Sequence, residues 1–392
     1  DSVKYNGFNL YSENKLKYRP RSITDAVFIT PGSLYSETKT LLTSKYLSNL
    51  KVFDYPTIHY QIDPKNENAL IANIFLTPRE KYRFGISADF IHSNIQDFGI
   101  SGNTSLKINN VLNGAETFQI GLRGNVGAAK DLANPNNNFF NISEYGIDAR
   151  LNFPRIFFPF KTERIIPKSM IPTTTLSVGY AKQTNIGLDK QSFTSSFAYN
   201  WTPKKNKSVK FSLIDVQYIK NVNVGNYFNV YTSSYNTLND IAIKYNASTD
   251  YFNNNTYSDG LVIESGIIDC FTDDNVLSQL EQNETDIKIV YNVFERKARL
   301  TENNLIVSSS VQFNLNTQKD TNDENYYAVK SKFESAGNLL SLISKLSNET
   351  QNQESKTLFN VVYSQYMKAE IEYLKHWDLG RKKVFAIRNF FG

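Results

Sequence analysis

Long apolar runs are missing from this sequence of 392 residues, and cysteine and histidine are scarce. No stretch reaches the roughly eighteen apolar residues that a membrane-spanning helix needs, which argues against a helical membrane protein. The single cysteine, Cys270, excludes an internal disulfide and offers no metal cluster. The three histidines, His59, His92 and His376, are interpreted as solvated or interfacial residues rather than as parts of a metal or Ser-His-Asp site. We therefore expect no metal site, no catalytic residue and no enzyme activity.

Charge and motifs argue against two further classes of function. Lys and Arg exceed Asp and Glu by five, without a basic stripe, so nucleic acid is not an expected partner. No nucleotide-binding motif is present, and no cofactor is expected. What the sequence does contain is 14% aromatic residues, together with many Asn, Ser and Thr. This mixture favours strands and the turns that join them.

The first part of the chain, residues 1–82, differs from the rest in the spacing of its apolar residues. Apolar residues recur at helical spacing between Tyr35 and Leu50, which predicts an amphipathic helix. A shorter helix is expected before it, opened by Pro20 and stopped near Gly32. This shorter helix spans Arg21–Ile29. The expected strands of this part are Val3–Leu10, Val52–Ile62 and Ala69–Leu76. The predicted order is β-α-α-β-β.

From residue 83 onward the apolar residues alternate with polar ones, which is typical of strands with one apolar and one polar face. The charged residues repeatedly share one face. The eleven expected strands are Phe84–Phe90, Phe98–Ile108, Phe118–Val126, Tyr145–Phe153, Thr174–Lys182, Ser192–Trp201, Val209–Tyr218, Leu305–Leu315, Tyr326–Ser335, Leu358–Tyr373 and Lys383–Phe391. Most are long enough for a tilted strand to cross a bilayer, which takes about 9 to 11 residues.

The gaps between these strands differ in length. Outer-membrane barrels have short periplasmic turns and longer external loops. If the first strand runs outward, the largest gap is a large external loop at about 221–304, with helix-like stretches at 238–245 and 276–280. The turns near 109–115, 202–208 and 376–381 are then periplasmic. The long connection at 154–171 and the short external gaps at 93–96 and 185–190 fit this scheme less well.

The competing interpretation is a soluble β-sandwich, in which one face packs on a core and the other meets water. Three features favour a membrane barrel: the long strands, the full charges on the polar face and the aromatic residues at strand ends. Such aromatics also occur in soluble sheets. The favoured fold is an all-β transmembrane β-barrel, partial, with about eleven strands present at 83–392, preceded by a small α+β domain at 1–82.

The arrangement resembles the BamA/TamA-type family of outer-membrane insertases and translocases, which carry periplasmic POTRA domains ahead of a barrel of sixteen strands. The stretches similar to the last POTRA domain are Tyr18-Arg19-Pro20, Ile29-Thr30-Pro31-Gly32-Ser33-Leu34-Tyr35 and Tyr46-Leu47-Ser48-Asn49-Leu50-Lys51-Val52-Phe53. In the barrel part, Ile166-Pro167-Lys168, Ser335-Ala336-Gly337-Asn338-Leu339-Leu340 and Ala386-Ile387-Arg388 look similar to TamA-like members.

The family's Val-Arg-Gly-Phe motif and its closing strand are not in this sequence. An open set of strands would leave an unpaired edge in lipid, so we expect a remainder of the barrel beyond Gly392.

The resemblance implies a mechanism in which the barrel opens against its closing strand, and an incoming client strand then pairs with the exposed edge of the first barrel strand, the lateral gate. That strand contains Arg83, Phe84, Gly85, Ile86, Ser87, Ala88, Asp89 and Phe90. The side chains of Phe84, Ile86, Ala88 and Phe90 would face lipid, and those of Gly85, Ser87 and Asp89 the lumen. Gly85 either loosens the strand or merely accommodates packing. Ser87→Pro is expected to block client pairing and to leave the rest of the barrel folded.

The resemblance also implies a place and a set of partners. The barrel would lie in the outer membrane of a Gram-negative cell, with the N-terminal domain in the periplasm. The expected partners are outer-membrane lipid, client outer-membrane or exported proteins, and periplasmic or lipoprotein accessory subunits. The alternatives are a passive secretion pore for a dedicated substrate, a soluble adhesive sandwich and, least favoured, an enzyme hosted in a barrel.

Overall fold

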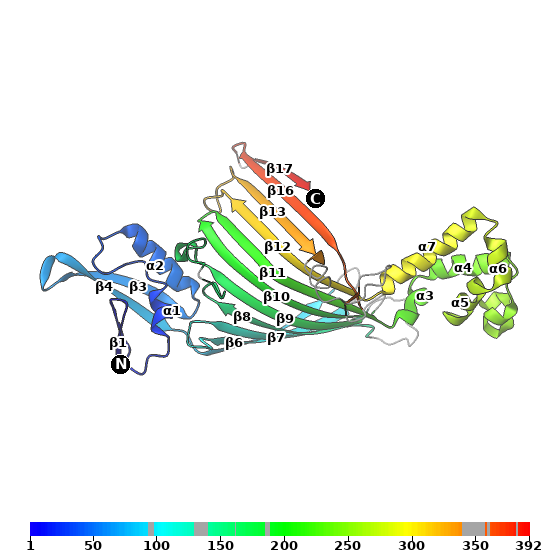
Figure 1. Cartoon of the computed structure of the whole chain (residues 1–392), viewed down its shortest axis with the longest axis horizontal. Helices are drawn as coiled ribbons and strands as arrows, with labels where there is room; N and C mark the ends of the chain where they lie inside the picture. The colour runs from blue at the N-terminus through cyan, green and yellow to red at the C-terminus, as the bar shows by residue number, and fades with distance from the viewer. Residues whose placement is uncertain are drawn as a thin grey trace.

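The computed structural model describes residues 1–92, 98–128, 140–160, 162–184, 189–338, 357–358, 361–381 and 383–392. The chain has three parts (Figure 1). A small N-lobe, residues 1–81, precedes a long curved sheet, and a helical lobe, residues 223–303, is inserted between two strands of that sheet. The N-lobe and the helical lobe lie at opposite ends of the strands (Figure 1). The gap at 221–304 thus leaves the sheet at the end away from the N-lobe, as the alternation of gaps predicts.

The N-lobe contains two short helices and two separate two-stranded sheets. The helix predicted at Tyr35–Leu50 is α2, and Ser36 caps its start by accepting a hydrogen bond from the Lys39 N–H. The short helix predicted before it is present but ends five residues earlier than expected, at Thr24. The elements are β1 (Ser2–Tyr5), β2 (Phe8–Tyr11), α1 (Pro20–Thr24), α2 (Glu37–Asn49), β3 (Phe53–Asp63) and β4 (Asn66–Pro78).

The single opening strand predicted at Val3–Leu10 is wrong. Asn6 and Gly7 have φ angles of 48° and 81°, and the chain reverses there into a hairpin of β1 and β2. Asn-Gly is the preferred pair for a two-residue turn with positive φ at both positions. In the described residues β1 pairs only with β2, and β3 only with β4, so the N-lobe order is β-β-α-α-β-β.

Within the described residues, the large sheet has eleven antiparallel strands that follow one another in sequence order, which agrees with the predicted number of about eleven. One predicted strand begins too early: Leu358–Tyr373 is not continuous, because the long strand starts only at Tyr366 and the short strands β14 (Thr357–Leu358) and β15 (Val361–Val362) precede it. The sheet strands are β5 (Tyr82–Ile91), β6 (Phe98–Asn109), β7 (Thr117–Ala128), β8 (Ile142–Phe153), β9 (Thr173–Thr184), β10 (Asp189–Lys204), β11 (Lys207–Val222), β12 (Asn304–Asn316), β13 (Tyr327–Ala336), β16 (Tyr366–Asp378) and β17 (Val384–Phe391).

The register places like residues together across the sheet. Phe84 lies opposite Leu106, and Leu106 opposite Ile120, whereas Asp89 lies opposite Ser101 and Ser101 opposite Asn125. In β8 and β9, too, apolar residues mostly lie opposite apolar residues and polar residues mostly lie opposite polar ones. Because neighbouring strands keep this register, one face of this half of the sheet is apolar and the other is polar.

The segment at 223–303, predicted as part of a large external loop with helix-like stretches, is a compact helical lobe. Its core contains fully buried side chains such as Phe228, Leu238, Ile267 and Leu280. Two of its helices lie where helical stretches are predicted, at 238–245 and 276–280, and the longest, α7, is not predicted. The helices are η2 (Val224–Asn226), α3 (Tyr227–Val230), α4 (Thr232–Lys244), η3 (Thr249–Tyr251), η4 (Asn253–Asn255), η5 (Tyr257–Asp259), α5 (Ser265–Thr272), α6 (Asp274–Leu280) and α7 (Glu284–Thr301).

None of the helices in the described ranges combines the length and the apolar character that crossing a bilayer requires.

Candidate functional site at the free edge of the sheet

The predicted gate residues, Arg83 to Phe90, lie together in β5, and β5 is the first edge of the sheet. β5 pairs with β6 along its whole length, from Tyr82 opposite Ile108 to Ile91 opposite Gly99. Its other side has no strand partner among the described residues. A row of unpaired backbone groups is a template onto which another strand can add.

The direction of the backbone groups along β5 follows from one hydrogen bond. The Asn109 N–H donates to the Lys81 carbonyl at 2.8 Å, and these two residues lie opposite each other when the β5–β6 register is extended by one residue beyond Tyr82 and Ile108. In an antiparallel ladder such hydrogen-bonded pairs alternate with non-bonded pairs. The odd-numbered residues of β5 therefore direct their N–H and C=O groups toward β6, and the even-numbered residues direct theirs toward the free edge.

This geometry corrects the expectation for Ser87→Pro. Ser87 is an odd-numbered residue opposite Asn103, so its N–H belongs to the β5–β6 ladder. Proline at position 87 removes a bond inside the sheet rather than one offered to a client. Besides Tyr82 at the start of β5, the residues that offer N–H groups at the free edge are Phe84, Ile86, Ala88 and Phe90.

The same four residues supply the apolar side chains of β5. Ile86 and Phe90 are 76% and 83% exposed, values that are unusual for large apolar side chains unless something else covers them. Their neighbours on the apolar face are exposed as well, among them Leu122, Ile147, Val178, Phe193, Val311, Phe333 and Ile371. The face forms one large apolar patch on a sheet that no second sheet covers within the described residues.

Gly85 lies on the polar face opposite Ser105. A Cβ atom at position 85 would lie 3.1 Å from the Ser105 Oγ, the end of a short side chain that can shift. The space therefore permits alanine with a small adjustment. Both interpretations of Gly85, a weak point of the strand or a packing accommodation, remain consistent with this contact.

The polar face carries paired charges. The Arg123 guanidinium contacts the carboxylates of Glu144 at 3.3 Å and Asp148 at 3.2 Å. Near the other edge, Arg388 on β17 contacts Glu372 on β16 at 2.6 Å. Exposed ion pairs of this kind add little stability, so their main consequence is a face that water can wet.

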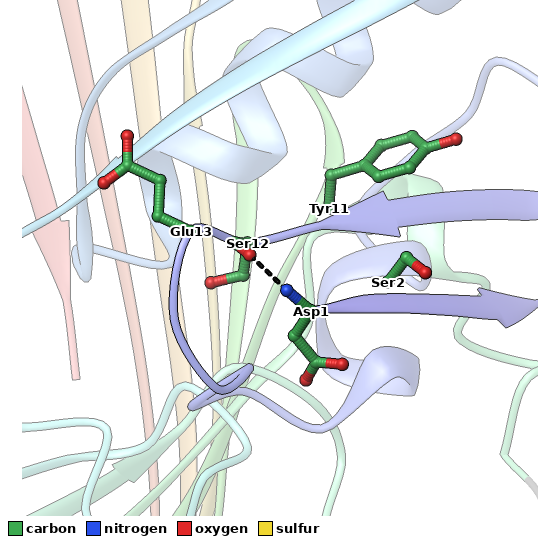
Figure 2. A pocket seen from close by; sticks show the side chains of 5 residues that line it. All are labelled: Asp1, Ser2, Tyr11, Ser12 and Glu13. Atoms are coloured by element: carbon green, nitrogen blue, oxygen red, sulfur yellow. Dashed lines mark hydrogen bonds between the residues drawn. The ribbon is translucent and has the colours of Figure 1, made fainter.

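Other places that could hold a ligand are less developed. A hollow at the start of the N-lobe is lined by Asp1, Ser2, Tyr11, Ser12 and Glu13, and the Asp1 ammonium group donates to the Ser12 carbonyl at 2.6 Å (Figure 2). In the described part of the chain, no group of three acidic, histidine or cysteine side chains is arranged to hold a metal ion.

His376 and His59 both contact aromatic rings. The ring of His376 stacks on that of Tyr326 at 4.5 Å, and the ring of His59 meets that of Phe75 edge-on.

Comparisons with known proteins find distant structural similarity. No family model and no curated protein matches the sequence. The chain is similar to the solved structure of BamA from Haemophilus ducreyi lacking POTRA domains 1–3, with a TM-score of 0.48 and 9% identity over 96% of this chain and 55% of that chain. It is similar to CdiB from Escherichia coli, with a TM-score of 0.45 and 8% identity over 95% and 51% of the two chains. CdiB from Acinetobacter baumannii has a TM-score of 0.32 and 7% identity over 95% and 60%.

The chain thus spans between half and two thirds of the length of these solved chains. Its assignment to the TamA-like branch of the BamA/TamA-type family and of its N-lobe to the POTRA domains stays a prediction.

Proposed function

We propose that this chain is part of an outer-membrane β-barrel that inserts or exports other proteins, and that a client strand pairs with the free edge of β5. The proposal rests on the combination of an exposed apolar face with an edge strand, β5, whose outer side has no strand partner among the described residues. In the closed barrel of the full-length protein a closing strand would occupy this edge, and it would separate from β5 before a client strand pairs there. The N-lobe would then lie in the periplasm and the helical lobe outside the cell. The partners would be outer-membrane lipid, client proteins and accessory subunits.

The apolar face supports a membrane environment. The apolar face contains side chains such as Phe84, Leu122 and Phe333. In the hydrocarbon of a bilayer such a face can remain exposed without causing aggregation. In a soluble sandwich this face would be covered by a second sheet. The polar face, with its Arg123 and Glu372 pairs, suits a water-filled interior.

The free edge supports a role in strand addition. Backbone hydrogen bonds to a client do not depend on the client's side chains, so one edge can serve many clients. In β5 the outward N–H groups belong to Tyr82 and to four residues with apolar side chains, Phe84, Ile86, Ala88 and Phe90. A client strand that pairs there would meet the same lipid-facing environment that it must finally occupy.

A passive secretion pore is the second candidate, and the wet, charged face favours it. Such a pore needs an interior but no strand addition at β5. The two functions therefore differ in what happens when the outward N–H groups of β5 are removed.

The experiment is a proline substitution at the free edge, made in the full-length protein reconstituted into lipid vesicles. Ala88→Pro removes an outward N–H group and keeps the β5–β6 ladder, because Ala88 lies at a non-bonded position. We expect the rate of client insertion to fall roughly tenfold, which corresponds to a loss of about 1.4 kcal/mol. The measurement is the fraction of client protected from added protease over time.

Two variants serve as controls. Ala88→Val keeps the N–H group and should insert clients at the parent rate. Ser87→Pro should weaken β5–β6 pairing and lower the stability of the sheet itself. If Ala88→Pro and Ala88→Val insert clients equally well while both remain folded, strand addition at β5 is wrong and the passive pore becomes the better explanation.

A further inference from the structure

The N-lobe meets the sheet at the turn between β6 and β7, residues 110–116, which we name the docking turn. Ala115 of this turn is 1% exposed and packs in the core of the N-lobe with Tyr18, Leu47 and Phe53. Two main-chain groups of the N-lobe bond to the turn. The Arg19 N–H donates to the Asn113 carbonyl at 2.6 Å, and the Asn110 side-chain amide donates to the Lys17 carbonyl at 2.8 Å. A turn of the sheet is therefore part of the core of the N-lobe.

The docking turn is held in an unusual conformation. Asn110, Asn113 and Ala115 have φ angles of 54°, 61° and 64°. Asparagine tolerates this region, but alanine rarely adopts it. A glycine at position 115 would be conformationally easier but would lack the methyl group that the N-lobe core contains. Burial of this methyl group offsets the conformational cost.

An ion pair between a buried carboxylate and a partly exposed guanidinium fixes the turn from the side of the sheet. The Glu116 side chain is 1% exposed, and its carboxylate accepts hydrogen bonds from the Gly114 N–H at 2.8 Å and the Arg155 guanidinium at 2.6 Å. A second guanidinium N–H donates to the Gly114 carbonyl at 3.0 Å. A buried carboxylate depends on such partners, because without them its charge is desolvated and uncompensated.

The segment that carries Arg155 also contacts the N-lobe directly. The Tyr46 hydroxyl on α2 donates to the Pro154 carbonyl at 3.1 Å, and burial raises the pKa of Tyr46 to about 12, which keeps this donor protonated. Further along, the Lys168 ammonium group lies 3.3 Å from the Val27 carbonyl and above the Phe28 ring. The N-lobe is thus attached to two connections of the sheet, the docking turn between β6 and β7 and the segment between β8 and β9.

We infer that the docking turn and the Glu116–Arg155 pair form a latch that holds the N-lobe against the sheet in one orientation, so that the two move as one body. The latch acts in addition to the covalent link at residues 79–81. This link has contacts with both parts. Arg79 contacts the Asp54 carboxylate of the N-lobe, and the side-chain amide of Asn109 in the sheet donates to the Glu80 carbonyl. The inference concerns the position of the N-lobe and holds for either candidate function.

The test is a distance measurement between two spin labels in the full-length protein in lipid vesicles. Cysteines replace Lys65, in the β3–β4 turn, and Lys205, in the β10–β11 turn, both of which are exposed. Cys270 is fully buried and should not take up the label. With the latch intact we expect a single narrow distance distribution, and Glu116→Ala should change it to a broad one.

Two further variants separate the latch from general damage. Ala115→Gly removes only the methyl group and relieves the backbone, and it should broaden the distribution while the strands keep their hydrogen-exchange protection. Arg123→Ala breaks ion pairs on the polar face away from the N-lobe and should leave the distribution narrow. A broad distribution in the parent protein, or a narrow one in both Glu116→Ala and Ala115→Gly, would overturn the latch.

Discussion

Asp286 is the residue that joins the start of α7 to the end of α4 in the helical lobe. Its carboxylate accepts hydrogen bonds from the Lys244 ammonium group at 2.5 Å and the Tyr245 hydroxyl at 2.8 Å. These two hydrogen bonds hold the pKa of Asp286 below its usual range. The bond from Lys244 has the larger effect and the bond from Tyr245 the smaller. The lobe thus depends on this carboxylate being ionised.

A pH dependence follows from the lowered pKa. The stabilisation is fully present above the unfolded pKa of about 3.9 and is lost as the pH falls through the lower folded value. We expect the hydrogen-exchange protection factors of α4 and α7, which are corrected for the intrinsic exchange rate, to fall when the pH falls below about 3.9, and Asp286→Asn to lower them already at neutral pH. Asp240→Asn changes an exposed aspartate of α4 and is the control. It should leave the hydrogen-exchange protection of α4 and α7 unchanged. Equal protection in the parent and Asp286→Asn at neutral pH would contradict the role given to this carboxylate.

Gly266 shows a second constraint at the residue scale. A Cβ atom at this position would lie 2.2 Å from the Tyr251 carbonyl oxygen, a main-chain atom that cannot easily move away. Gly266→Ala should therefore destabilise the helical lobe by about 1–3 kcal/mol, the usual range for overpacking a buried site. The measurement is the denaturant midpoint of the lobe, with Ser265→Ala at the exposed neighbouring position as the control. An unchanged midpoint would mean that α5 can shift to admit the methyl group.

At the scale of single elements, the strands are the part of this fold that the sequence predicts best. Alternation of apolar and polar residues is a local signal, and in β5 and β6 it marks both the strand and its two faces. Strand boundaries are less well marked, as the late start of β16 shows. The hairpin of β1 and β2 is missed when Asn6-Gly7 is passed over, although this pair is a strong turn signal.

The helical lobe shows why a long gap between strands can hide a fold. Asn283 caps α7, and Ile287, Val290 and Phe294 recur at spacings of three and four residues, which is a helical pattern. The core that these residues join is formed by segments far apart in the sequence, so no single window reveals it. The backbone direction in β5 is hidden for a related reason: it depends on the register with β6, and the sequence alone does not fix that register.

The lobe is expected to be separable from the sheet. Ile219 of β11 lies opposite Asn304 of β12, so the two strands already meet at the base of the lobe. Replacing residues 222–301 by a short Asn-Gly turn should close this hairpin and leave strand pairing intact. The measurement is hydrogen-exchange protection of β11 and β12 in the full-length protein. Lost protection in both strands would show that the lobe is needed to hold the sheet together.

At the scale of the whole molecule, the apolar face decides what environment the chain requires. The face extends over strands from β5 to β17 and includes Phe84, Leu122, Phe333 and Phe385 among its exposed residues. Monomeric soluble proteins rarely expose apolar patches larger than a few hundred Å². A barrel explains the exposure through lipid, and a soluble protein would need a second layer to cover it.

Gel mobility of the full-length protein in detergent, unheated and boiled, tests this environment. A closed barrel in which every strand is hydrogen-bonded to two neighbours should resist detergent until it is heated, so the unheated sample should migrate at a different position from the boiled one. The control is the variant in which the Asn-Gly turn replaces the helical lobe. It should show the same difference in mobility between unheated and boiled samples, because the strands cause this difference. If no shift occurs and the protein stays in solution in buffer without detergent, the apolar face must be covered by protein. A soluble sandwich would then explain the sequence pattern better than a membrane barrel.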